Sequence, residues 1–166
     1  MKEIKVKNVI MGKQFEDSEN LQELLKIIKE KNIKSNVVEI GDRIYIEKDL
    51  YFDVIWPDSK YVISENSINN NALVCKLFYK NFTMLFTGDI EEQAEQVLAS
   101  KYEDTNILKS TVLKVAHHGS KSSSSSEFLE LVQPKIALIG VGEDNLYGHP
   151  NSIVIEKLEK LRYKSF

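Results

Sequence analysis

One aspartate and the three histidines of the sequence follow predicted strands, and these residue types suit acid–base or metal chemistry. Asp89 comes directly after an apolar strand, and the pair His117 and His118 follows the next strand along the chain. His149, the third of three histidines, lies in the loop after a further apolar strand. Loops of layered α/β folds gather ligands at the carboxyl edge of the sheet. We therefore expect a metal or phosphate site there, with Asp89, His118 and His149 within ~10 Å of each other, the scale of a two-metal site with its ligands.

Each of these residues also has a purely structural interpretation. A zinc site needs three or four His, Cys or carboxylate ligands, so this set is sufficient only if all its members converge. Asp89 precedes a predicted helix and could be its N-cap, which is the interpretation that the residue pattern alone favours. Neighbouring residues of an extended chain point to opposite sides, so at most one of His117 and His118 is easily aimed at a given ion.

A phosphate could bind just beyond the histidine pair. Gly119 and Ser120 form a predicted tight turn, and a run of serines at 122–126 precedes a predicted helix. Free N–H groups at the start of that helix, with Lys121 nearby, would suit a phosphate. Ser120 and Lys121 are therefore candidate phosphate-binding residues. The alternative is an ordinary flexible, low-complexity loop.

The hydrophobic pattern predicts an α/β fold in one domain, residues 1–166, with a mixed sheet and flanking helices. Segments with helical spacing of apolar residues alternate with short apolar or alternating runs typical of strands. The two-residue stretches at 41–42 and 80–81 are expected to be hairpin turns. We expect helices at about 18–31, 90–100, 126–133 and 151–161, and strands around 4–10, 37–40, 44–46, 51–56, 72–79, 82–86, 111–116 and 135–141.

Composition is that of an ordinary globular domain. The chain has 166 residues, about the length of one domain, of which 42% are hydrophobic and 28% charged. A formal net charge of -3 gives no general attraction to nucleic acid or anionic membranes, so any polyanion contact must be local. No apolar run has the length of a membrane span and no signal peptide is apparent, so we expect no membrane contact by this chain itself. The single cysteine, Cys75, excludes an internal disulfide.

Four ordered motifs carry a family resemblance. They are NNNALVCKLFY, FTMLFTGDIE, LKVAHHGSKSSSSSEFL and PKIALIGVGEDNLYGHP, within residues 69–150. Together they resemble the metallo-β-lactamase-like domain of the ComEC/Rec2 competence proteins and stand-alone hydrolase relatives, including a bacterial phosphorylcholine esterase. The upstream LLKIIKEKNIK and FDVIWP segments are similar too, so the resemblance covers nearly the whole chain. The family's main metal motif, His-x-His-x-Asp-His, does not occur in these residues.

The resemblance implies the later part of an αββα sandwich and a set of roles. In such enzymes two divalent ions, zinc or manganese, activate a water that attacks a phosphoester. Asp89 looks like the ligand that bridges the two metals, and His149 like a ligand of the second. His118 looks like a catalytic contact to the substrate phosphate, with His117 as a supporting catalytic residue. Near Asn71 several relatives carry another metal-binding histidine, so one metal position would be weakened or filled by manganese. The residues themselves indicate turn chemistry for this asparagine.

Without the main metal motif, the metal ligands that the resemblance implies in this chain make up only half of a two-metal site. We therefore expect the C-terminal part of a metal-dependent hydrolase of DNA or another phosphodiester, with no useful activity as this chain alone. The alternative is a degenerate, metal-free domain that binds nucleic acid or a partner. Expected partners are the N-terminal half of the same domain, a DNA or small phosphodiester substrate, and a second copy of the chain. A competence protein would place the domain at the extracytoplasmic face of the membrane, and a stand-alone relative in the cytoplasm or outside the cell.

Overall fold

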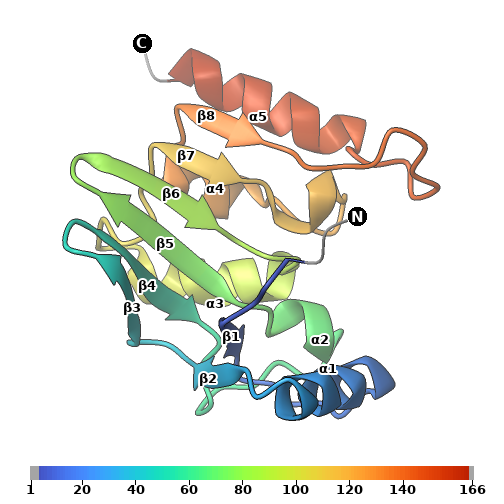
Figure 1. Ribbon diagram of the computed structural model, residues 1–166. Coiled ribbons are helices and arrows are strands. Elements are labelled where there is room, and N and C mark those ends of the chain that lie inside the picture. Colours follow the sequence, from blue (N-terminus) through green and yellow to red (C-terminus); the bar gives the residue numbers. More distant parts are fainter. Residues whose placement is uncertain (1–3, 165–166) are drawn as a thin grey trace.

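The computed structural model describes residues 4–164 as two sheets with associated helices (Figure 1). The smaller sheet pairs β1 (Asn8–Gly12) with β2 (Lys34–Val38), in parallel. The larger sheet has the strand order β3-β4-β5-β6-β7-β8, and its strands are β3 (Arg43–Glu47), β4 (Leu50–Trp56), β5 (Val74–Tyr79), β6 (Phe82–Phe86), β7 (Val112–Lys114) and β8 (Ile136–Leu138). The helices are α1 (Glu19–Glu30), α2 (Ser67–Asn70), α3 (Glu92–Tyr102), α4 (Ser126–Val132) and α5 (Ser152–Lys164), with a short 3₁₀ turn, η1, at Ala116–Gly119.

The prediction of an α/β fold with a mixed sheet and flanking helices is confirmed. Strands β3 to β6 are antiparallel, whereas β6, β7 and β8 are parallel. The change of direction follows from the connections, because α3 joins β6 to β7 and α4 joins β7 to β8, and a helical crossover returns the chain to the same edge of a sheet. Among residues 4–164, no helix combines the length and the apolar character that crossing a membrane requires.

Two local predictions need correction. Residues 41–42 were expected to form a hairpin turn between β2 and β3, but β2 pairs with β1 and β3 pairs with β4. The helical crossover through α1 makes β1 the partner of β2, so the 41–42 turn instead carries the chain from one sheet to the other. The loop between Trp56 and β5 also contains a short helix, α2, that its polar composition did not indicate.

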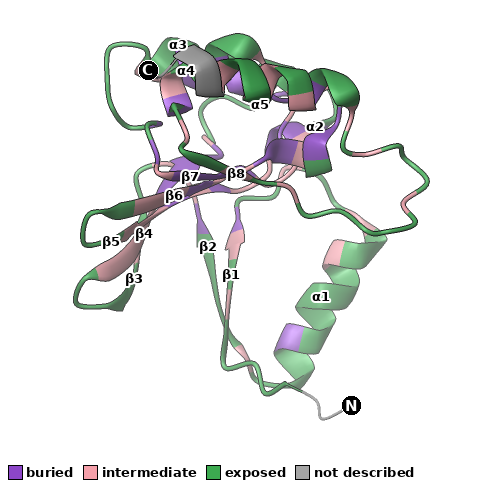
Figure 2. Cartoon of the chain, turned by 90° about the horizontal axis from the view of Figure 1, so that it is seen from above, coloured by how far each residue is buried: buried purple, intermediate pink, exposed green. Residues whose placement is uncertain are grey.

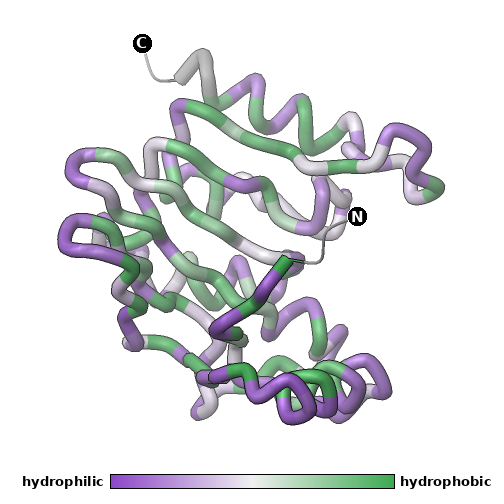
Figure 3. The backbone as a smooth tube through the Cα atoms, viewed as in Figure 1, coloured by the Kyte–Doolittle hydropathy of each residue, from purple (hydrophilic) through white to green (hydrophobic). Residues whose placement is uncertain are grey.

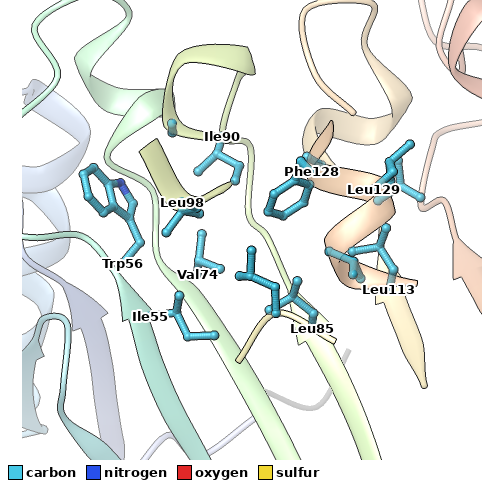
Figure 4. Close-up of a cluster of buried hydrophobic side chains, with 14 of the residues drawn as sticks. Ile55, Trp56, Val74, Leu85, Ile90, Leu98, Leu113, Phe128 and Leu129 are labelled. Atoms are coloured by element: carbon cyan, nitrogen blue, oxygen red, sulfur yellow. The ribbon is translucent and has the colours of Figure 1, made fainter. Parts of the chain in front are cut away.

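A hydrophobic core lies between the larger sheet and helices α3, α4 and α5. Hydrophobic residues line the strands of this sheet, while the turns that join β3 to β4 and β5 to β6 are hydrophilic (Figure 3). Side chains from strands and helices interlock in the core, where Leu85, Leu98 and Phe128 are fully buried (Figure 4). The core therefore fixes the helices on one face of the sheet and the order of the loops along its edge.

The opposite face of the larger sheet is not covered by α3, α4 or α5 (Figure 2). Figure 2 shows α3, α4 and α5 on one side, while β1, β2 and α1 project from the other. Two side chains near the β8 edge of the open face, Ile136 and Leu138, are 53% and 48% exposed. An apolar row crosses the larger sheet through the cross-strand pairs of Ile44, Phe52, Leu77, Met84, Val112 and Ile136; Val112 is buried, Ile136 is exposed and the other four are partly exposed. This agrees with the expectation of an exposed apolar surface.

Candidate functional site at the carboxyl edge of the sheet

The candidate site lies where the three parallel strands end. Because β6, β7 and β8 run in the same direction, their carboxyl ends share one edge of the sheet (Figure 1). The segment after β6 carries Asp89, the segment after β7 carries His117 and His118, and the segment after β8 carries His149. The fold thus gathers at one edge the residues that the sequence placed after separate strands.

Asp89 lies at this edge of the sheet and is not the cap of a helix. Helix α3 begins at Glu92 and its N-cap is Glu91, which leaves the Asp89 carboxylate 42% exposed. Gly88 permits the turn before Asp89, because its φ is +58° and an added Cβ would make a tight contact of 3.1 Å with the Cβ of Ala72. The structure thereby removes the capping interpretation that the residue pattern favoured.

Two cations or potential cations approach the Asp89 carboxylate. Lys114 Nζ lies 4.0 Å from Asp89 Oδ1 and also donates a hydrogen bond of 3.2 Å to the carbonyl of Gly88. His118 Nε2 lies 3.8 Å from the same carboxylate oxygen. The Nδ1 atom of His118 is 2.5 Å from the carbonyl oxygen of Gly140, which can only accept, so Nδ1 carries the hydrogen. In the neutral imidazole, Nε2 is then an electron-pair donor that faces a carboxylate, and such a pair suits a bound cation.

The two adjacent histidines adopt an uncommon backbone conformation. His117 has φ 46° and ψ 44°, and His118 has φ 55° and ψ 23°, both in the left-handed region. Non-glycine residues there cost of order 1–3 kcal/mol and cluster at functional sites. Gly119 follows at φ +79°, where an added Cβ would lie 2.8 Å from the Cβ of Pro150. The histidine turn therefore packs closely against the loop that holds His149.

His117 and His149 lie beside each other. Their ring centroids are 5.9 Å apart at an interplanar angle of 65°. The ring of Tyr147 stacks on that of His149, with centroids 5.9 Å apart and an interplanar angle of 19°. Asn145 holds this loop, because its Oδ1 accepts the backbone N–H of His149 at 2.9 Å and its Nδ2 donates to the carbonyl of His149 at 2.8 Å. Within residues 4–164, Nδ1 of both His117 and His149 is buried without a hydrogen-bond partner.

Several backbone N–H groups around the start of α4 already have acceptors within the protein. The backbone N–H groups of Ser124 and Ser125 donate to the carboxylate of Glu95 at 2.6 and 2.7 Å. The side chain of Ser125 caps the helix by accepting the N–H of Phe128. A carboxylate of the protein thus occupies the place that we assigned to an anion.

The two candidate phosphate ligands differ in their surroundings. Ser120 is buried, and its hydroxyl lies 3.0 Å from that of Ser122. Lys121 is exposed. Their phosphate-binding role stays a prediction, now without the support of the helix start.

Asn71 ties the backbone together and does not face the site. It is 4% exposed, its Oδ1 accepts the N–H of Ile63 at 3.1 Å, and its Nδ2 donates to the carbonyls of Ile63 and Ser67 at 2.8 and 2.7 Å. Both the oxygen and the nitrogen of the Asn71 amide are therefore hydrogen-bonded to the backbone. The turn-chemistry interpretation of this asparagine is therefore the one that the structure supports, and a role as substitute for a metal-binding histidine is not.

A pocket of about 500 Å³ adjoins the site. Its lining includes two of the three histidines and consists of His118, Gly140, Val141, Gly142, Asn145, Tyr147 and His149. Sequence reasoning missed Asn145, Lys114 and Glu91 as parts of this region. The position of Lys114 two residues before Ala116, at the end of the strand that precedes the histidines, is the only signal that pointed to it.

The donor types at the edge suit divalent metal ions, but the described residues do not form a complete metal site. Carboxylate and imidazole are ordinary zinc ligands, and the facing pair of His118 Nε2 and Asp89 supplies electron pairs, as would the unpartnered Nδ1 of His149. Among residues 4–164, however, no group of three or more His, Cys, Asp or Glu side chains converges as around a metal ion. The residues present fit part of such a site.

The sequence is similar to segments of several known proteins, two of which carry competence names. The chain is 34% identical over 160 residues, 96% of its length, to ComE operon protein 3 of Bacillus subtilis, of which the match covers 20%. It is 35% identical over 116 residues to Recombination protein 2 of Haemophilus influenzae, covering 70% of the chain and 14% of that protein. It is 34% identical over 103 residues to Competence protein ComA of Neisseria gonorrhoeae, covering 62% of the chain and 14% of that protein.

The chain is homologous to a segment of competence proteins. These relatives are consistent with a ComEC/Rec2 family, and they support a competence-protein-like parent. No family model matches the sequence. The chain spans about a fifth of the length of ComE operon protein 3 and less of the other two.

Proposed function

We propose that this chain is the C-terminal part of a metal-dependent phosphoester hydrolase domain of the metallo-β-lactamase type, within a competence-protein-like parent. The observation that carries the proposal is the meeting of Asp89, His118, His117 and His149 at one edge of the sheet, from three separate segments. The homology to competence proteins favours DNA or another phosphodiester as the substrate. In such a parent the domain would lie at the extracytoplasmic face of the membrane.

The chain's own residues would bind and orient both substrate and metal. Two zinc or manganese ions, when bound, would supply a nucleophilic hydroxide and polarise a phosphoryl oxygen. Asp89 and His118 would hold a cation, while His149 offers an Nδ1 without another partner among residues 4–164 and His117 would offer a ring nitrogen beside it. Lys114 beside Asp89 offsets part of the negative charge at the edge. The adjoining pocket, lined by Tyr147 among others, has room for one part of a small phosphodiester.

The proposal is tested by phosphodiester hydrolysis with added Mn²⁺ or Zn²⁺. We expect no useful turnover by residues 1–166 alone, because a catalytic zinc needs three protein ligands and a dinuclear site more. A longer chain that adds a His-x-His-x-Asp-His segment upstream should be active, and Asp89→Ala should abolish its turnover. Asp144→Ala, an exposed carboxylate in the loop after β8, is the matched control and should leave turnover unchanged. Robust metal-dependent turnover by residues 1–166 would refute the half-site argument.

A metal-free binding domain is the second candidate function. The observation in its favour is that no three metal-ligating side chains converge among residues 4–164. If the longer chain is folded but neither binds Mn²⁺ nor hydrolyses phosphodiesters, this second function replaces the first. A calorimetric titration of the longer chain with metal distinguishes the metal-dependent hydrolase from the metal-free binding domain before any substrate is chosen.

The open apolar face of the larger sheet is where we propose that the N-terminal half of the same domain packs, through a second sheet. Two sheets that pack face to face bury side chains from their inner faces, and the apolar row across six strands offers such a face. Leu138→Lys, at a position 48% exposed, should leave this chain folded and weaken its binding to a separately added upstream half. Sedimentation of this chain as a dimer, with dissociation by the same substitution, would instead assign the face to a second copy.

A further inference from the structure

The carboxylate of Glu91 lies beside the imidazole of His117. Glu91 Oε1 is 3.4 Å from His117 Nδ1, and the two side chains are only 14% and 23% exposed. That nitrogen is buried and has no hydrogen-bond partner among residues 4–164. The contact is long for a hydrogen bond and is not aligned as one.

Glu91 itself is held from three directions. Asn66 Nδ2 donates to Oε2 at 2.8 Å, and the hydroxyl of Ser122 donates to Oε1 at 3.1 Å. The backbone N–H of Glu91 donates to Oδ1 of Asn70 at 3.1 Å. Each carboxylate oxygen therefore has a donor, and the oxygen shared with Ser122 is the one that faces His117.

The backbone of His117 is equally constrained. Its N–H donates to the carbonyl of Gly88 at 3.2 Å, and its carbonyl accepts the N–H of Ser120 at 2.8 Å. The residue is fixed in the left-handed region, so the imidazole can change little except by rotation about its side-chain bonds. The ring lies between Glu91 and His149, whose centroid is 5.9 Å away.

We propose that Glu91 is a positioning residue that accepts the Nδ1–H of His117 and thereby fixes its tautomer. A neutral imidazole carries one hydrogen, and a carboxylate can only accept. The other tautomer would place two acceptor atoms 3.4 Å apart in a half-buried site. With the hydrogen on Nδ1, Nε2 is the nitrogen that carries the free electron pair. A carboxylate that orients a functional histidine in this way also raises the basicity of its other nitrogen.

Histidine tautomers can be read directly from long-range ¹H–¹⁵N spectra of residues 1–166. We expect neutral His117 in the wild-type chain to have Nδ1 protonated and Nε2 bare. His118 should show the same pattern through its contact with the carbonyl of Gly140, and so provides an internal standard. A wild-type spectrum with His117 protonated on Nε2 overturns the proposal, whatever the variants do.

The decisive variant is Glu91→Gln. Asn66 donates to Oε2, so the amide oxygen should take that place and the amide NH₂ should take the place of Oε1. The hydroxyl of Ser122 can turn to accept, and His117 Nδ1 would then face a donor. We therefore expect His117 to change to the Nε2–H tautomer, while His118 keeps its own. Glu92→Gln, the exposed neighbour on the same helix, is the matched control and should change neither histidine. An unchanged tautomer of His117 in folded Glu91→Gln refutes the role.

The catalytic consequence rests on the proposed function, whereas the tautomer does not. In an active longer chain, Glu91→Gln should lower kcat roughly 10- to 100-fold with little change in KM, the usual effect of removing a partner that orients a metal-site histidine. An inactive longer chain with the expected tautomers would retain the positioning role and reject the hydrolase. If Glu91→Gln changes the tautomer of His117 but not the kcat of the longer chain, the proposed link between that tautomer and catalysis is rejected.

Discussion

Glu95 provides the most direct test of how this fold holds its serine-rich loop. The residue is 0% exposed, and its two oxygens accept the backbone N–H groups of Ser124 and Ser125 at 2.6 and 2.7 Å. Glu95→Ala would leave both N–H groups without an acceptor. A buried unsatisfied donor costs about 1–3 kcal/mol, so the free energy of unfolding should fall by roughly 2–6 kcal/mol. That is a large part of the ~5–15 kcal/mol typical of a domain.

Urea unfolding measures this loss, and Glu92→Ala is the control. Glu92 lies in the same helix but is exposed, so its removal should change stability by no more than about 0.5 kcal/mol. Equal midpoints for Glu95→Ala and Glu92→Ala would refute the assigned hydrogen bonds. A large loss for Glu95→Ala alone would show that the loop depends on this carboxylate.

Glu95 also gives a sign for the pH dependence. Burial raises the pKa of Glu95 above its ordinary value of 4.5, against the opposing effect of the hydrogen bonds from Ser125 and Ser124. Between the unfolded and folded pKa the native state binds more protons, so stability falls as pH rises through this window. Glu95→Gln cannot titrate, so the wild-type chain should lose stability relative to that variant as pH rises above about 4.5. A relative gain over the same range would contradict this sign.

Three further outcomes are expected. Gly119→Ala should destabilise the chain by more than Gly41→Ala. Both residues have a positive φ, which costs any side chain about 1–2 kcal/mol, but only the Cβ added at Gly119 would meet Pro150, at 2.8 Å. Equal losses of stability in urea unfolding would refute the close packing at Gly119. Lys76→Met should lower the free energy of unfolding by roughly 1–3 kcal/mol, because the buried ammonium donates to the backbone carbonyls of residues 106, 107 and 109. The same substitution of a surface lysine should have no effect in urea unfolding. Burial raises the pKa of the Cys75 thiol from 9.0 to about 11. Alkylation of this thiol at pH 8 should therefore be roughly 100-fold slower in the native chain than in urea. Similar alkylation rates in the two conditions would exclude a buried thiol.

Local signals predicted the elements whose causes are local. Ser18 caps α1 by accepting the N–H of Leu21, as its position before an apolar helical pattern indicated. The 80–81 turn joins β5 and β6, whose pairing of Tyr79 with Phe82 leaves a two-residue loop. Both features depend on residues close in sequence, so composition and spacing were sufficient to locate them.

Pairing between distant segments was beyond the sequence pattern. The alternation around 37–46 is the same whether β2 pairs with β3 or with β1, and only the helical crossover through α1 selects the parallel partner. Likewise, the residues around Asp89 permit either a cap or a free carboxylate. Glu91 becomes the cap because the backbone turns at Gly88 and Asn70 accepts the N–H of Glu91 from another segment.

The sequence by itself determined which side chains are available at the candidate site and the order in which strands deliver them. Asp89, His117, His118 and His149 each follow an apolar run, and that relation needs no knowledge of distant contacts. Only the tertiary structure decided which of them meet, because the parallel order of β6, β7 and β8 sets the edge they share. It also decided that a buried carboxylate takes the N–H groups at the start of α4. That choice depends on the packing of α3 against α4, and such contacts between distant residues leave no periodic trace in the chain.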